Sequence, residues 1–403
     1  VITPTGSTAT VTMTYLSYSN GAQVRIAGAN QAEYNGTFTI ANVTRDTFTY
    51  AISGTPASPA TGTIYAQLID YGHVGWVWDC AADGGGMSLE LISTTVSNNY
   101  GQNWGVSLTA GGTPGGPNSI AAADIAPVIL DVQHLPVIPS SADPVTVTAR
   151  IIDELVTRVT AAVYYRIDGA PGFTAAAMYD DGLHGDGAAG DRIFGAVLPP
   201  QTSGTIVEFY LWASDSTGRT RTWPAPNPIT GQRAALLYQV DDSFDPNAPW
   251  SPGAQPVFRL VMTAAERAEL ADIGAGGGDQ DSNAMMNATL IVVDGTGPNV
   301  RYNVGVRNRG HGSRVGPPNN FHVSIPHDRP WNDLVALNFN CRAVHAQALG
   351  AAVYQMAGFA VPNLMPVQLR INNVNPAVSG NYQWGTYGLL EAFNGDFLER
   401  QIP

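Results

Sequence analysis

Short runs of alternating apolar and polar residues, separated by glycine, proline and asparagine, are the feature that most limits what this chain can fold into. Alternation with a period of two is typical of a β-strand with one buried and one exposed face. Glycine (44) and proline (28) are abundant among the 403 residues, and helical periodicity is scarce. We therefore expect a mostly β, multidomain protein, with β-sandwiches in series followed by an α+β domain.

The charges of the chain exclude several classes of function. The formal net charge is −13 at pH 7, so we expect no nucleic-acid partner, because nucleic acids bind to basic patches. All 19 basic residues are arginine, which excludes lysine chemistry and leaves arginine as the only charged side chain for phosphate contacts. No apolar run is long enough to span a membrane. The chain begins at Val1 without a signal peptide, which indicates a processed chain or a fragment.

Changes in composition divide the chain into five segments. We expect a small β-module, part of a first sandwich, an Ig- or fibronectin-like sandwich, an acidic proline-rich linker and an α+β domain, at 1–68, 69–121, 122–240, 241–255 and 256–403 respectively. In the first module, Asn35-Gly36 suits a tight hairpin turn. In the last domain, Thr263 and Glu266 predict a capping box for a helix that ends near Ile273.

Aromatic and glycine-rich motifs mark the second segment. They are Trp76-Val77-Trp78-Asp79, the glycine run before Met87-Ser88-Leu89-Glu90-Leu91, and the stretches 99–104 and 111–118. This segment resembles the closing strands of a bacterial lamin-tail domain, an Ig-like β-sandwich, and it covers only the C-terminal half of that domain. The resemblance implies that Leu89 and Leu91 pack inward and that Trp104 closes one end of the sandwich.

An aspartate- and glycine-rich stretch interrupts the predicted third segment at residues 179–191. Its carboxylates are those of Asp180, Asp181, Asp186 and Asp191. Calcium prefers several oxygen ligands in a loop with glycines at its sharp turns, so the stretch suggests a calcium site, although its spacing is not that of an EF-hand. The alternative is a turn between strands in which the aspartates cap backbone amides.

The stretch from Val304 to Ile325 reads as strand, turn and strand, with an Arg-Gly motif in its turn. Val304 and Val306 alternate with more polar residues before the turn, and Phe321, Val323 and Ile325 do so after it. Glycine lets backbone amides approach an anion closely, and arginine offers forked donors to phosphate. The alternative is an ordinary polar hairpin whose arginines are solvated.

The order of motifs in the last domain carries a family resemblance. The segment Val306-Arg307-Asn308-Arg309-Gly310-His311-Gly312-Ser313-Arg314 is followed by the strand 319–325, a leucine-asparagine strand with a helix at 343–356, the strand 367–372, and the closing segment 387–398. In this order, residues 256–403 resemble the N-lobe of the CotH family of spore-coat kinases. Proteins that join lamin-tail, Ig-like and CotH segments are typical of bacterial cell surfaces.

The resemblance implies an atypical kinase, secreted or at the cell surface, that transfers a phosphoryl group from ATP to a protein substrate with Mg or Mn. It implies that Glu391 lies near the adenine edge. It also implies that phosphate contacts come from three arginines and two glycine amides: Arg307, Arg309, Arg314, Gly310 and Gly312. His322 and its neighbours replace a lysine usual in the family. We expect the C-lobe aspartates to lie beyond Pro403, so this polypeptide alone is expected to be inactive.

The alternative function is structural. In it the chain is a cell-surface structural or adhesion protein, whose lamin-tail and Ig-like domains do the work and whose kinase-like domain is degenerate. Its partner is then another cell-surface molecule rather than a protein substrate. The missing lysine at the position near His322 favours this alternative for the chain as given.

Overall fold

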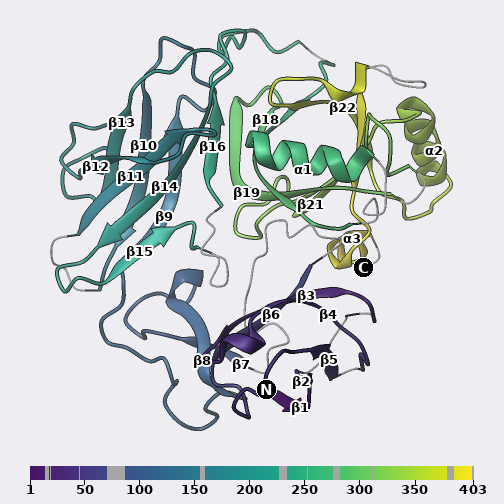
Figure 1. The fold of residues 1–403 in the computed structure, drawn as a ribbon. Helices are drawn as coiled ribbons and strands as arrows, with labels where there is room; N and C mark the ends of the chain where they lie inside the picture. The colour runs from purple at the N-terminus through teal and green to yellow at the C-terminus, as the bar shows by residue number, and fades with distance from the viewer. Residues whose placement is uncertain are drawn as a thin grey trace. The chain divides into compact units, whose positions relative to one another are not determined.

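The structure is a computed structural model that describes residues 1–13, 18, 20–44, 46–69, 87–154, 159–226, 234–251, 253–275, 282–310, 313–378 and 385–401. This part of the chain is mostly β, with several sheets and a small helical portion (Figure 1), which confirms the predicted fold class of β-sandwich domains in series. The chain divides into two compact units, formed by residues 1–130, 151–160 and 213–233, and by residues 131–150, 161–212 and 234–403. No helix among the described residues is long and apolar enough to cross a membrane.

Two three-stranded sheets form the N-terminal module, in the orders β1-β2-β5 and β4-β3-β6. Their strands are β1 (Ile2–Thr5), β2 (Thr8–Thr12), β3 (Gln23–Ala29), β4 (Gly36–Thr39), β5 (Thr47–Ala51) and β6 (Gly62–Ile69). Alternate residues of the strands point into one hydrophobic core, as the period of two predicts. Large members of this core are Ile2, Ile26, Tyr34, Ile40 and Phe48.

The connection between β3 and β4 differs from the tight hairpin expected at Asn35-Gly36. A 3-10 turn, η1 (Ala32–Tyr34), makes this connection instead. The amide of Asn35 then bonds to the backbone of Ala29, donating to its carbonyl at 2.8 Å and accepting its N–H at 3.0 Å. A side chain that satisfies the backbone of the preceding strand therefore replaces the two-residue turn.

A two-stranded sheet of β7 (Met87–Leu91) and β8 (Trp104–Ala110) follows, with the 3-10 turn η2 (Gly101–Asn103) before β8. The expectation that Leu89 packs inward is wrong, because its side chain is 54% exposed and Glu90 is buried instead. The Glu90 carboxylate accepts the N–H and the O–H of Ser119, each at 2.7 Å. This polar anchor sets which face of β7 is buried. The motif Trp76–Asp79 lies outside the described residues.

The third segment folds into two sheets, in the orders β13-β10-β9 and β12-β11-β14-β15, with β16 paired to β14. The strands that the sequence predicted at 145–149, 162–167 and 206–213 are found within β10, β11 and β14. The strand bounds are β9 (Val128–Leu135), β10 (Val145–Ile152), β11 (Thr160–Ile167), β12 (Thr174–Met178), β13 (Ile193–Leu198), β14 (Ile206–Ser214), β15 (Thr220–Trp223) and β16 (Leu236–Gln239).

The C-terminal segment forms a closed barrel in the order β17-β18-β19-β20-β21-β23-β22. Parallel pairing of β17 with β22 closes the barrel, and the other neighbours are antiparallel. The strands are β17 (Val257–Val261), β18 (Met286–Val293), β19 (Pro298–Asn308), β20 (Phe321–Ser324), β21 (Ala336–Asn340), β22 (Leu364–Ile371) and β23 (Tyr387–Glu391). The helical elements are α1 (Ala264–Ala275), α2 (Val344–Met356), η3 (Pro376–Val378) and α3 (Gly395–Gln401).

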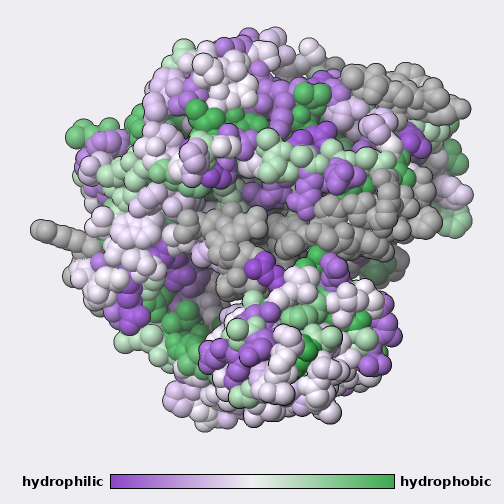
Figure 2. Space-filling model, in the orientation of Figure 1, coloured by the Kyte–Doolittle hydropathy of each residue, from purple (hydrophilic) through white to green (hydrophobic). Residues whose placement is uncertain are grey.

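The barrel strands each have one apolar face turned to a common core. Val304 and Val306 of β19 and Phe321 and Val323 of β20 are buried there, as their alternation predicted. The residues between them point to the outer face of the barrel, on which α2 packs over β22 and β23. On the molecular face seen in Figure 2, hydrophobic residues of the described part are spread among hydrophilic ones.

Only half of the predicted capping box forms at the start of α1. The hydroxyl of Thr263 accepts the N–H of Glu266 at 3.2 Å, as expected of an N-cap. The Glu266 carboxylate accepts the N–H of Asn287 in β18 at 2.9 Å, so the box is replaced by a contact with the sheet.

Within the second unit, β16 of the sandwich lies beside the barrel strands β18 and β19 (Figure 1). Apolar side chains from both sides form a separate core there: Val137, Ile138, Ala235, Leu237, Val261 and Ile291. His134 of β9 is fully buried beside it, hydrogen-bonded to the hydroxyl of Tyr302 in β19 and stacked on Tyr238 with ring centroids 5.2 Å apart. We call this contact region the sandwich–barrel junction.

Candidate functional site

The outer face of the barrel carries a row of residues that are direct partners across five strands. The row runs from Arg307 in β19 through His322, Asn338 and Leu390 to Leu364 in β22. It is cationic at one end, polar in the middle and apolar at the other end, and we call it the outer-face row. The core-facing residues of the same strands fix its register, because a slip by one position would turn them outward.

His322 sits in the middle of the row as a half-buried neutral ring. Its Nδ1 lies 2.8 Å from Oδ1 of Asn338, an oxygen that can only accept, so Nδ1 carries the hydrogen. Nε2 is then the acceptor, and the hydroxyl of Ser324 lies 3.3 Å from it. Burial and the charges of Arg307 and Arg309 lower the pKa of His322, against the opposing effect of the Asn338 bond.

Arg309 follows the row at the end of β19 and connects it to helix α2. Its guanidinium donates to Oδ1 of Asn340, and Nδ2 of Asn340 donates to Gln347 of α2 at 2.8 Å. Burial lowers the pKa of Arg309, but arginine keeps its proton at any ordinary pH. A fixed positive charge therefore stands beside the neutral His322.

Arg314, the third arginine of the predicted phosphate-facing set, has a different position. It is only 5% exposed, and its guanidinium donates to the carbonyls of Ser282 and Asn308 at 2.7 and 3.0 Å. It also shares Oδ1 of Asn283 with Arg307, at 2.8 and 3.2 Å. Arg307 and Arg314 thus meet at Asn283, and Arg314 is used to hold its loop rather than presented on the outer face.

Of the other predicted nucleotide-binding residues, Gly310 and Glu391 lie in the described part of the chain. Gly310 has φ +107°, and a Cβ there would lie 2.5 Å from Oγ of Ser313, so the turn requires glycine. Gly312 lies outside the described residues. Glu391, at the end of β23, is buried and forms an ion pair with Arg400 of α3, whose Nε lies 3.0 Å away.

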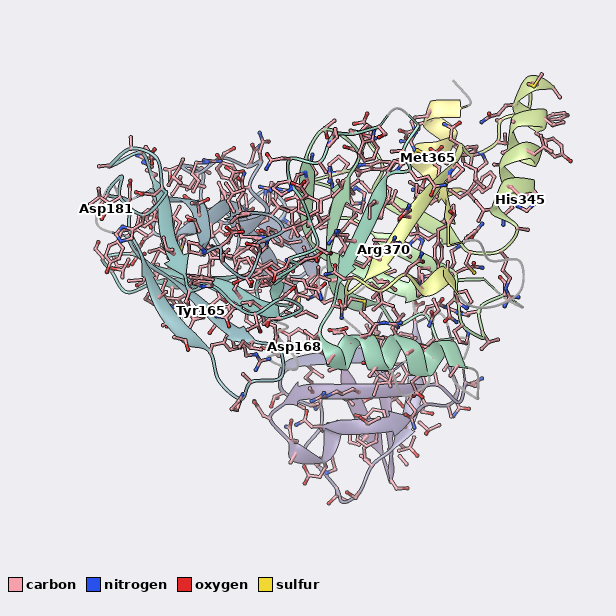
Figure 3. The ribbon with its side chains drawn as sticks, turned by 90° about the horizontal axis from the view of Figure 1, so that it is seen from above. Tyr165, Asp168, Asp181, His345, Met365 and Arg370 are labelled. Carbon is pink, nitrogen blue, oxygen red and sulfur yellow. The ribbon has the colours of Figure 1, made fainter. Side chains whose placement is uncertain are left out.

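The aspartate-rich loop of the sandwich turns its carboxylates onto its own backbone. Asp186 is 1% exposed and accepts the N–H groups of Asp181, Gly182 and His184 at 2.7 to 2.9 Å. Burial would raise the pKa of Asp186, and these amide donors hold it below its usual value instead. Asp181, labelled in Figure 3, likewise accepts the N–H of Leu183 at 2.9 Å.

Both oxygens of Asp180 and of Asp191 also accept loop amides. This arrangement is the one that the amide-capping alternative describes. Among the described residues, no group of three His, Cys, Asp or Glu side chains is placed to hold a metal ion. A calcium ion would have to compete with these amides for the carboxylates, and the calcium site stays a prediction.

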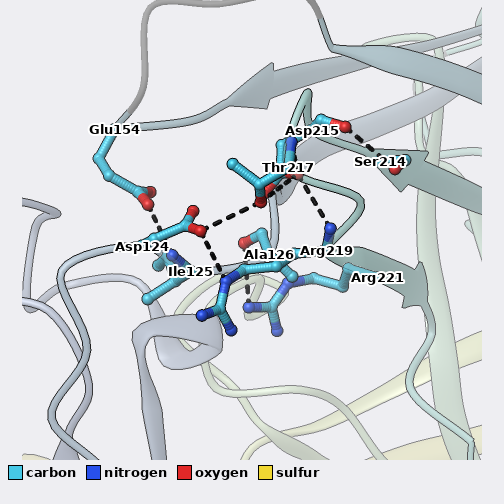
Figure 4. Close-up of polar contacts among 9 residues, drawn as sticks. All are labelled: Asp124, Ile125, Ala126, Glu154, Ser214, Asp215, Thr217, Arg219 and Arg221. Atoms are coloured by element: carbon cyan, nitrogen blue, oxygen red, sulfur yellow. Dashed lines mark hydrogen bonds and ion pairs between the residues drawn. The ribbon is translucent and has the colours of Figure 1, made fainter.

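A further polar cluster in the first unit was not found from the sequence (Figure 4). Asp124 accepts from Nε of Arg219 at 2.8 Å and from the hydroxyl of Thr217 at 3.1 Å. Asp215 accepts the N–H groups of Thr217 and Arg219 at 2.8 and 2.9 Å, which closes the turn between them. The signal in the sequence was the run of turn-forming residues from Asp215 to Arg219. The hydrogen bonds of Asp215 stabilise this turn.

The outer-face row therefore brings arginine, imidazole and apolar side chains onto one register line. Arginine side chains bind phosphate or carboxylate, and a neutral imidazole can accept or donate one hydrogen. Helix α2 packs over the strands at the apolar end. Met365 and Arg370 of β22 are labelled in Figure 3 for orientation, with His345 at the start of α2.

Comparison with known proteins identifies one segment of the chain. Residues 149–219 match the family described as the conditioned medium factor 2nd Ig-like domain. No match to this chain was found among curated proteins. The predicted Ig-like character of the third segment is thereby confirmed.

Proposed function

We propose that the barrel is the nucleotide-holding part of a kinase-like protein that resembles the CotH family. The observation that carries this proposal is the outer-face row, which changes from cationic Arg307 to apolar Leu390 and Leu364 along one register line. A nucleotide has the same polarity, with an anionic phosphate chain at one end and a flat base at the other. The substrates would be ATP, with Mg or Mn, and a protein.

The dimensions of the row suit this ligand. Neighbouring strands lie about 4.8 Å apart, so the four steps from β19 to β22 span roughly 19 Å. Phosphates would lie at Arg307 and Arg309, and the base would lie toward Leu390 and Leu364, where α2 and Gly388 approach closely. A Cβ on Gly388 would stand 3.3 Å from both Leu364 and Val344.

The side chains of the row would have separate tasks in binding. Arg307 and Arg309 would supply forked donors to phosphate oxygens. They would thereby replace the lysine that is usual in the CotH family. His322 would stay neutral beside them and add a hydrogen bond without further charge, and the metal ion would neutralise the phosphate chain when bound. Arg314 would support the position of Arg307 through Asn283.

The test is calorimetric titration of the full chain with ATP and ADP, in the presence of magnesium or manganese. We expect binding that weakens at least about tenfold on Arg309→Ala, because one charge-assisted contact contributes roughly 1.5–3 kcal/mol. The matched control is Arg370→Ala. Arg370 also lies on the outer face of the barrel, has its pKa lowered by burial and donates to an amide oxygen, that of Gln368.

The outcomes separate cleanly. A folded chain that binds neither nucleotide would overturn the proposal, and so would an equal loss of binding in both variants. Binding of inorganic phosphate with the same affinity as ATP would show an anion site without use of the apolar end of the row.

A second candidate function has its own support. The Ig-like match at residues 149–219 carries the description of a conditioned medium factor, which supports a location outside the cell. In this proposal the chain is a secreted or cell-surface structural or adhesion protein, its partner is another surface molecule, and the kinase-like barrel is degenerate. The lamin-tail resemblance of the second segment belongs to the same proposal. Retention of surface binding by an Arg309→Ala variant that has lost nucleotide binding would favour it.

A further inference from the structure

Glu266 occupies an unusual place, because it continues the hydrogen bonding of a sheet from within a helix. Strand β17 ends at Val261, opposite Thr289 of β18. The N–H of Asn287 lies beyond that end, and the Glu266 carboxylate accepts it at 2.9 Å. The first turn of α1 thereby supplies a hydrogen-bond acceptor to β18 beyond the point where β17 ends.

The side chain of Asn287 reaches from the barrel into the sandwich–barrel junction. Its Nδ2 donates to the carbonyl of Ala235, beside β16, at 2.8 Å. A carbonyl can only accept, so this bond fixes which end of the amide is nitrogen. The other end, Oδ1, is buried and has no hydrogen-bond partner among the described residues, and the whole residue is only 3% exposed.

Negative charges gather around Glu266. Glu269 lies one turn further along α1, and Glu208 of β14 approaches from the sandwich, where its Oε1 pairs with Nε of Arg166 at 2.9 Å. Burial first, and these two carboxylates in addition, raise the pKa of Glu266 to about 7, against the lowering effect of the Asn287 bond.

The other charged groups on the neighbouring elements have separate partners. Asp168, shown near the start of α1 in Figure 3, accepts the N–H of Ala264 at 2.7 Å. Strand β18 contains no ionisable residue. On β19, Arg307 bonds to Asn283 and Asn308, Tyr302 to His134, and Arg301 to the carbonyl of Pro330. None of these supplies a positive charge to Glu266.

We propose that Glu266 is a proton-operated latch between the sandwich and the barrel. In its neutral form the carboxyl group accepts the Asn287 N–H with one oxygen and donates its own hydrogen to Asn287 Oδ1 with the other. Loss of that proton leaves Oδ1 without a donor and adds a negative charge beside Glu208 and Glu269. The junction is therefore held more tightly at mildly acidic pH and opens more readily at alkaline pH.

The direction follows from linkage. A carboxyl group whose pKa is raised on folding stabilises the folded state below that raised pKa, and the contribution is lost as the pH rises from the ordinary value through the raised one. The window for Glu266 therefore runs from about 4.5 to about 7. His134 acts in the opposite sense over a similar range, so a local measurement is needed.

The experiment is hydrogen exchange of the full chain at about pH 5.5 and about pH 8.5, corrected for the intrinsic exchange rates. The reporters are the N–H of Asn287 and the N–H of Leu237, which donates to Oγ1 of Thr289 across the junction at 3.0 Å. We expect protection of both amides to fall about thirtyfold at the higher pH, because about 1.5 units of the Glu266 window, from pH 5.5 to about 7, lie between the two measurements and each unit corresponds to a tenfold change.

Three variants make the test decisive. Glu266→Gln keeps an acceptor and a donor at all pH values, so its protection should stay high at both. Glu266→Ala has neither and should be poorly protected at both, and Glu399→Gln, an exposed carboxylate of α3, should behave as the wild type. Equal protection of the wild type at both pH values, or a pH dependence retained in Glu266→Gln, would overturn the proposal.

Discussion

The aspartate-rich loop of the sandwich and the outer-face row of the barrel differ in what holds their charged groups. In the loop, carboxylates accept N–H groups of the same short segment, so that Asp186 binds three amides within six residues. In the row His322, and beside it Arg309, bind side-chain amides of a neighbouring strand, those of Asn338 and Asn340. The first set is bound to fixed backbone and the second to groups that can rearrange.

This difference teaches how to weigh a cluster of ionisable residues. Backbone amides in a closed turn cannot turn away, so a ligand must displace them at the full cost of desolvation. Side-chain amides can rotate toward a ligand or exchange one partner for another at lower cost. Both stretches stood out in the sequence for the same reason, their density of charge and glycine, but Asp186 is held by backbone amides whereas Arg309 and His322 are held by side-chain amides.

The largest expected effect is a loss of stability at Arg314, an arginine of the predicted phosphate-facing set that is held like the loop aspartates. Arg314 is bound as the loop aspartates are, to the backbone carbonyls of Ser282 and Asn308. We expect Arg314→Ala to lower the free energy of unfolding by about 3 kcal/mol, because buried carbonyls lose a charged donor. Urea unfolding measures this change. Arg309→Ala should cost clearly less, and equal losses would remove the distinction between the two arginines.

The fully buried His134 tests how an ionisable group that no ligand can reach contributes to the pH dependence of stability. Burial lowers the pKa of His134 to about 4, against the opposing bond to the carbonyl of Val137. The unfolded chain binds this proton first, so stability should fall as the pH drops from about 6.5 to about 4, by roughly 3 kcal/mol. Denaturation across this range should be done in the Glu266→Gln background, where the opposing carboxyl is absent. A flat profile there would contradict the prediction.

Asp186 sharpens the contrast between amide capping and metal binding. Asp186→Ala leaves three partly buried N–H groups without their acceptor and should cost about 2 kcal/mol, with the exposed Asp191→Ala as the smaller control. Calorimetry with and without calcium then separates the two interpretations. An unchanged Tm in calcium supports amide capping. A Tm that rises in the wild type but not in Asp186→Ala would establish the predicted calcium site.

The smallest expected effect is a change in the pKa of His322 in the outer-face row. The charges of Arg307 and Arg309 lower the pKa of His322, so Arg309→Ala should raise it, and bound inorganic phosphate should raise it too. NMR titration of the imidazole resonances follows both changes. If phosphate leaves the pKa of His322 unchanged while it binds, then it binds away from the row.

Parts of the fold could be predicted because they depend on local pattern. The β-strands at Val145–Ile152 and Ile206–Ser214 follow from periodicity and turn residues. The N-cap at Thr263 was predicted for the same reason. The helix at Val344–Met356 was expected from the order of motifs in the family resemblance. The partner of Glu266 was not, since Asn287 is brought to it by strand pairing, and the inward turn of Glu90 in place of Leu89 depended on Ser119, well beyond the strand.

The sequence by itself determined that the chain is β-rich, that its third segment is Ig-like and that only arginine can supply charged side-chain contacts to phosphate. Tertiary structure alone decided that parallel pairing of β17 and β22 closes a barrel, that Arg314 is buried while Arg309 stands on the outer face, and that the loop aspartates bind their own backbone. The reason is that charge and alternation are local properties of a chain. Which polar groups keep capacity for a ligand depends on partners that only the register of distant strands brings together.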